Sequence, residues 1–150
     1  MAESKVSPIS LRIQRVLAYP PERVFDAWTQ AATLSRWFAP SDDIASIVHV
    51  LEPRVGGSYR IEMKRKDGTS HSVIGRYLEV KRPERLVFTW AWDDRPEDGQ
   101  TLVTVEFAKS GGGTALTLLH EKFPTEDART QHNAGWVGCL GRIERVLTAS

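Results

Sequence analysis

The chain has 150 residues, of which 41% are hydrophobic and 26% are charged, with 20 basic side chains against 19 acidic ones. This length and composition are typical of one globular domain that can enclose an internal pocket. The formal net charge of +1 provides no basic surface for nucleic acid or anionic membranes, so we expect neither as a partner.

The N-terminus and the single cysteine indicate where the protein works. The first ten residues, MAESKVSPIS, are polar and lack the apolar core of a signal peptide, and no apolar run reaches the ~18 residues that span a bilayer. Cys139 is the one cysteine, which excludes an internal disulfide and suits a reducing compartment. We therefore expect a cytoplasmic protein without membrane insertion. It would have a disordered tail over residues 1–8 and one domain over residues 9–150.

The first predicted element is a strand that starts near residue 9. Ile9, Leu11 and Ile13 alternate with polar residues, which is the pattern of a half-buried strand. The alternation falters at Arg15 and Val16, and we predict a β-bulge there.

Two short helices follow. The stretch PPERVFDAW opens with two prolines and carries a glutamate in its first turn, and both features favour a helix start. The stretch AATLSRWFAP predicts a second short helix, which ends at Pro40. The apolar faces of these helices comprise Val24, Phe25 and Trp28 in the first and Leu34, Trp37 and Phe38 in the second.

From about residue 44 the apolar period changes to two, which predicts six further strands. They are IASIVHVLE, SYRIEMKRK, HSVIGRYLEV, RLVFTWAW, TLVTVEFA and TALTLLHEKF. Most connections are tight turns, such as KDG, where Gly68 supplies a positive φ, and the longer DDRPEDG is polar. Consecutive strands with tight turns form an antiparallel meander, so we predict a seven-stranded sheet of an α+β fold, with one face buried.

The C-terminal stretch predicts a long helix that covers the concave face of the sheet. Thr125 is a suitable N-cap, and Glu126 and Asp127 follow it in the first turn. At 100° per residue, one arc of this helix carries His132, Trp136, Cys139, Leu140, Ile143, Val146 and Leu147.

Three glycines lie inside this helix, although each weakens a helix by about 0.8–1.0 kcal/mol relative to alanine. Gly138 and Gly141 fall nearly opposite the apolar arc and Gly135 at its flank, so we expect them to face away from the sheet. Either the helix is mildly weakened where tertiary packing holds it, or another backbone, such as that of a dimer partner, approaches closely.

The sequence contains no recognisable catalytic or metal-binding motif. The spacing of His120, His132 and Cys139 matches no zinc pattern, and a mid-helix apolar cysteine is a poor nucleophile. The glycine-rich stretches VGGSYR and SGGGT lead into strands, as hairpin turns do, and neither has the ending of a phosphate-binding loop. We therefore expect no catalytic residue, cofactor or metal, and a pocket suited to binding.

The ordered succession of GGSYR, PERLVFTW, LLHE and HNAGW resembles the activator of heat-shock-protein-90 ATPase homologue family. That family belongs to the START-like, or SRPBCC, helix-grip superfamily, and the resemblance covers residues 9–148. It implies a curved antiparallel sheet wrapped round a long C-terminal helix, with a cavity between them. This chain does not contain the extra N-terminal domain of the larger eukaryotic activators, which argues against a chaperone ATPase as its partner.

The resemblance and the inward-facing positions together predict a ligand cavity. The resemblance places seven residues in or near it: Trp37, Phe38, Tyr59, Trp90, His120, His132 and Trp136. The inward faces of the strands and of the helix add Ile61, Met63, Phe88, Val105, Leu118, Cys139 and Leu140.

Three functional hypotheses remain open. The first is a non-enzymatic protein that binds a small hydrophobic molecule, such as a lipid, or an aromatic one. The second is an enzyme similar to the superfamily's polyketide cyclases and dehydratases, with His120 or His132 as acid–base group. The third is an interaction module, either a co-chaperone-like stress protein or a homodimer.

Overall fold

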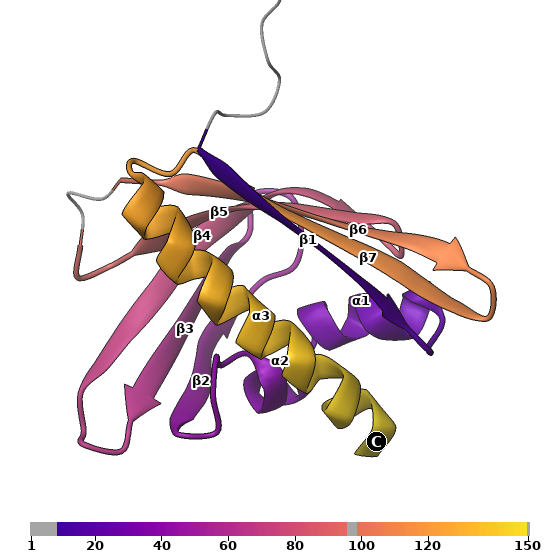
Figure 1. The fold of residues 1–150 in the computed structure, drawn as a ribbon, viewed down its shortest axis with the longest axis horizontal. Helices are drawn as coiled ribbons and strands as arrows, with labels where there is room; N and C mark the ends of the chain where they lie inside the picture. Colours follow the sequence, from indigo (N-terminus) through magenta and orange to yellow (C-terminus); the bar gives the residue numbers. More distant parts are fainter. Residues whose placement is uncertain (1–8, 96–98, 150) are drawn as a thin grey trace, which may run out of the picture.

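The computed structural model describes residues 9–95 and 99–149, and Figure 1 shows its elements. In chain order they are β1 (Ser10–Leu17), α1 (Pro21–Thr29), α2 (Ala31–Trp37), β2 (Ile44–Leu51), β3 (Ser58–Arg65), β4 (Ser70–Lys81), β5 (Arg85–Trp92), β6 (Thr101–Ser110), β7 (Gly113–Glu121) and α3 (Glu126–Ala149). The predicted disordered tail, residues 1–8, and residues 96–98 of the polar connection lie outside the described residues.

The strands form one antiparallel sheet in the order β1-β7-β6-β5-β4-β3-β2. Strands β2 to β7 are a meander, and β1 joins it at the far edge by pairing with β7. The three helices lie on the concave side of the curved sheet, which α3 crosses diagonally (Figure 1). The prediction of a seven-stranded curved antiparallel sheet with two short helices and a long C-terminal helix is confirmed.

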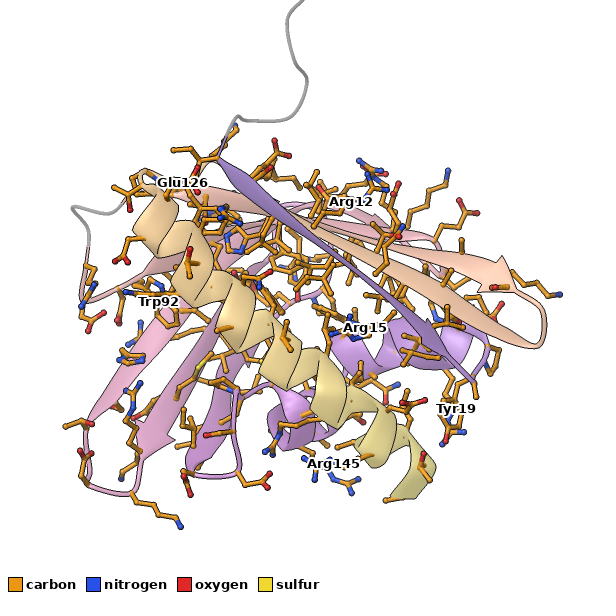
Figure 2. All side chains as sticks on the ribbon, viewed as in Figure 1. Arg12, Arg15, Tyr19, Trp92, Glu126 and Arg145 are labelled. Carbon is orange, nitrogen blue, oxygen red and sulfur yellow. The ribbon has the colours of Figure 1, made fainter. Side chains whose placement is uncertain are left out.

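The predicted bulge in β1 is wrong. The pairing of β1 with β7 runs without interruption from Ser10 opposite Glu121 to Leu17 opposite Thr114. The strand alternates regularly between its two faces, but here the apolar residue is on the outward face. Val16 points outward and is 73% exposed. Arg15 takes the inward position, on the side of β1 opposite Arg12 (Figure 2). It is tolerated because β1 is an edge strand, where a half-exposed guanidinium keeps water and donates to the Gln14 carbonyl.

The register shifts lie on the other half of the sheet. One falls between Val48 and Val50, where β2 pairs with β3, and one between Tyr77 and Glu79, where β4 pairs with β5. Such irregularities bend a strand and increase its local twist. They therefore add curvature where the sheet wraps around α3.

The start of α3 and its apolar face are as predicted. The Thr125 hydroxyl oxygen accepts from the Ala128 backbone N–H at 3.1 Å, which is an N-cap bond. The buried residues of the helix are Trp136, Cys139, Leu140, Ile143 and Leu147. They pack into a core shared with the inward faces of the strands and with α1 and α2.

Gly138 faces away from the sheet, as expected, but its face of α3 is covered by another segment of the chain, and Gly135 departs from the expectation because it lines the cavity between α3 and the strands. A Cβ built on Gly138 would lie 2.2 Å from the Pro40 carbonyl oxygen. The backbone that approaches Gly138 is therefore the loop after α2 of the same chain and not that of a dimer partner. Around Gly135 and Gly141 a Cβ would meet nothing within 4 Å. Gly141 is exposed, and Gly135 is partly buried.

Alanine substitutions at two of these glycines should change stability in opposite directions. Gly138→Ala forces the helix and the Pro40 loop apart, and overpacking of this kind costs about 1–3 kcal/mol. Gly141→Ala meets open space and gains helix propensity, up to about 1 kcal/mol. Urea unfolding of both variants and the parent measures the difference, and equal stability of the two variants would contradict the close contact.

Candidate functional site

A cavity of about 580 Å³ lies between the N-terminal half of α3 and the strands β3 to β5. Its apolar wall, which we call the aromatic wall, consists of Phe38, Met63, Trp90, Trp92, Trp136 and Cys139. The rings are in mutual contact: the centroid of Trp90 is 5.1 Å from that of Trp136 and 5.6 Å from that of Trp92. We call this space the outer cavity.

The predicted lining residues divide into three groups. Six line the outer cavity: Phe38, Met63, Trp90, His132, Trp136 and Cys139. Three more, Tyr59, Ile61 and Phe88, line an inner cavity of about 20 Å³. The other five, Trp37, Val105, Leu118, His120 and Leu140, line neither cavity and are buried in the interior. The arc of a helix or the face of a strand identifies which residues point inward, but it does not show where the packing leaves space.

His120 is held by a directional chain of hydrogen bonds. The Trp136 indole Nε1–H donates to His120 Nδ1 at 3.0 Å. Since Nδ1 accepts, the proton of the neutral ring is on Nε2, which lies 2.7 Å from Thr101 Oγ1. The Thr101 hydroxyl in turn donates to the Trp90 carbonyl at 3.2 Å. Every polar atom of this buried chain is satisfied, and it joins α3 to β7, β6 and β5.

His132 carries the opposite tautomer. Its Nδ1 lies 2.7 Å from the Ala128 carbonyl one helical turn earlier, and this carbonyl can only accept. Its Nε2 accepts from the indole N–H of Trp92 at 3.1 Å. Figure 2 shows Trp92 beside the N-terminal half of α3, on the side of β4 and β5. The His132 ring therefore lines the outer cavity with both nitrogens already in hydrogen bonds.

Burial keeps the reactive groups of the site neutral. Desolvation, with a smaller contribution from the charge of His132, holds the pKa of His120 well below its usual value of 6.5. Burial also raises the pKa of the Cys139 thiol to about 12, so that it remains protonated at neutral pH. Neither group has the protonation behaviour of a catalyst that works near pH 7.

The mouth of the outer cavity is charged, which the sequence analysis did not predict. It includes Arg65, His71, Asp94, Arg95 and Asp127. A signal for Arg65 was present, because it follows Tyr59, Ile61 and Met63 at the next inward position of β3. The Arg65 guanidinium donates to His71 Nε2 at 3.4 Å, which joins β3 to β4 at the rim.

No metal centre is evident in the part of the chain that the structure describes, because no three His, Cys, Asp or Glu side chains gather there. In the same residues, no helix has the length and apolar character needed to cross a membrane.

Comparisons with known proteins agree on one family. The family model described as "Activator of Hsp90 ATPase homolog 1-like protein" matches residues 18–148. A solved structure from Chromobacterium violaceum is 30% identical with a TM-score of 0.86, covering 93% of this chain and 97% of that one. The AHSA1 protein from Silicibacter pomeroyi is 26% identical with a TM-score of 0.81, covering 93% and 98%.

A third solved structure, the AHSA1-like protein from Aeromonas hydrophila, is 28% identical with a TM-score of 0.77, covering 93% of this chain and 92% of that one. No curated protein matches the chain at a significant level.

The buried neutral His120 makes stability depend on pH. Because its pKa is lower in the folded protein than in the unfolded chain, the unfolded chain binds the proton first as the pH falls. The contribution of neutral His120 to the free energy of unfolding is complete above about pH 6.5. Below that pH the free energy of unfolding should decrease by about 1.4 kcal/mol per pH unit, down to the folded pKa. His120→Gln, which does not titrate, should show a shallower decrease in urea unfolding between pH 7.5 and 5. Parallel slopes would contradict this assignment.

Proposed function

The chain belongs to the family of activator of Hsp90 ATPase homolog 1-like proteins, and we propose that it is a non-enzymatic binding protein for a small hydrophobic or aromatic molecule. The observation that carries the proposal is the outer cavity, about 580 Å³ in volume with an aromatic wall. Its volume lies within the range of about 300–1,000 Å³ that sites for small molecules have, and its lining combines the aromatic wall with polar and charged side chains. We place this activity in the cytoplasm.

The two ends of the cavity suit an amphipathic ligand. The aromatic wall offers ring faces and edges for stacking with an aromatic or planar apolar group. The charged mouth, which includes Arg65 of β3 and Asp127 of α3, is where charged parts of a ligand would meet solvent. A ligand that carries a charged group would therefore enter with that group last.

Binding is favoured over a cyclase-like reaction by the state of the histidines. An acid–base catalyst needs a ring nitrogen directed at the substrate. Both nitrogens of His120 are in buried hydrogen bonds away from the cavity, and those of His132 bind Ala128 and Trp92. A reaction at either ring would first have to break one of these bonds.

Filling the cavity from α3 tests the proposal. Gly135 lines the outer cavity, and a Cβ atom built there meets no atom within 4 Å. Gly135→Phe should place a ring in the cavity and weaken binding of the neutral fluorescent probe N-phenyl-1-naphthylamine. The ring covers apolar surface that the probe would otherwise bury, about as much as one large side chain. Losing that contact weakens the binding free energy of the probe by about 1.5–3 kcal/mol, which raises its Kd roughly ten- to 150-fold. Fluorescence titration measures the effect.

Gly141→Phe is the matched control. It adds the same ring to the same helix at an exposed position that is also free of neighbours within 4 Å. Its Kd for the probe should stay within about twofold of the parent, because it buries nothing against the cavity. Non-saturable binding in the parent, or equal Kd values in the two variants, would overturn the proposal.

The description of the matched family supports one second candidate, a co-chaperone role in the stress response. If the chain has this role, it should stimulate ATP turnover by purified Hsp90 in a coupled assay. Boiled protein and an Hsp90-specific inhibitor are the controls. An unchanged rate at high micromolar concentrations of the chain would remove this candidate and leave the binding proposal intact.

A further inference from the structure

The inner cavity lies next to the outer one and shares a wall with it. Phe38 and Trp90 line both spaces, so the two spaces meet at these side chains. The inner volume of about 20 Å³ is enough for one water-sized group, since about 10–15 Å³ suffices for a water molecule. The inner cavity is therefore too small for a ring and large enough for a single oxygen atom.

Two tryptophans of the inner cavity have indole N–H groups without a partner. Nε1 of Trp28 and Nε1 of Trp90 are buried, and no described residue accepts from them. The other three indoles donate within the protein, namely Trp37 to the Ala27 carbonyl, Trp92 to His132 and Trp136 to His120. Buried donors are almost always paired, so two unpaired donors on residues that line one small space indicate a missing acceptor.

The chemistry of the lining defines that acceptor. An indole N–H can only donate, so its partner must offer a lone pair. The hydroxyl hydrogen of Tyr59 is already committed to the Thr89 carbonyl at 2.6 Å. No lysine or arginine lines the inner cavity. A carboxylate would therefore lie there without a counter-charge, at a large desolvation cost, whereas a neutral carbonyl oxygen would not.

We propose that the inner cavity receives a neutral carbonyl oxygen of the ligand, which accepts hydrogen bonds from the indole N–H groups of Trp90 and Trp28. The inference rests on the proposed binding function and narrows its ligand to aromatic ketones, aldehydes or esters whose ring occupies the outer cavity. Trp90 is then the residue that determines specificity, because it lines both spaces and can contact the ring of the ligand as well as donate its N–H to the oxygen.

An isosteric pair of compounds tests this inference. In 2-isopropenylnaphthalene a CH₂ group replaces the carbonyl oxygen of 2-acetylnaphthalene, so shape is kept and the acceptor is lost. Kd values come from displacement of N-phenyl-1-naphthylamine from the parent and from Trp90→Phe, which keeps a ring but removes the N–H. The ratio of the alkene Kd to the ketone Kd should fall by about five- to tenfold in Trp90→Phe, the worth of one hydrogen bond.

Trp37→Phe is the matched control, because its indole N–H is already bound to the Ala27 carbonyl. It should leave the ratio unchanged. An equal ratio in the parent and Trp90→Phe, with both compounds bound, would overturn the inference while the proposed function stands. Failure of both compounds to displace the probe would overturn the ligand class, and failure of the probe itself to bind would overturn the function.

The indole N–H resonances of the parent provide a second readout that needs no folded variant at position 90. In a ¹H–¹⁵N spectrum, saturating 2-acetylnaphthalene should move two indole proton signals downfield, and 2-isopropenylnaphthalene should not. The signals of Trp37, Trp92 and Trp136 should show no such difference, because their acceptors are within the protein. Identical spectra with the two compounds would contradict the hydrogen bond.

Discussion

The hydrogen bond from Trp136 to His120 is the contact on which the site depends. It lies in the interior, where a polar contact is strong and an unpaired polar group is costly. The bond is also directional, because an indole N–H can only donate. The Nδ1 atom of His120 must therefore accept, which keeps the ring neutral, and its Nε2–H donates a hydrogen bond to Thr101. The bond thereby fixes the middle of α3 against the sheet. The outer cavity lies toward the N-terminus of the helix, and the solid core around Ile143 and Leu147 lies toward its C-terminus.

A second contact holds α3 from another side. The Pro40 carbonyl lies against the backbone of Gly138, so the loop after α2 and the helix approach more closely than any side chain permits. Near this contact, Arg142 donates to the Arg36 carbonyl and pairs with Asp42. The helix is thus fixed both through a buried imidazole and through backbone contact. A cavity can persist beside it because the surrounding elements are held apart by contacts made elsewhere.

The sequence predicts the elements and their inward faces well, because the period of apolar residues depends on local geometry. The strands, the Thr125 cap and the buried arc of α3 all follow from that pattern. It does not predict which segment meets a given face, so Gly138 was assigned to the outside although Pro40 covers it. It also does not show where packing leaves space, which is why His120 was expected beside the cavity and lies in the core. In β1 the residue types led to the wrong prediction of a bulge, because an inward arginine is acceptable on an edge strand.

The pairing of β1 with β7 has a consequence for how the molecule is made. Gln14 and Thr117 bond across these strands although 103 residues separate them in the chain. The hairpins of the meander can close as soon as each leaves the ribosome, but β1 has no neighbour until β7 emerges. Contacts this distant along the chain also slow folding. For most of translation the first strand therefore stays unpaired, and the molecule closes only when its last segments arrive.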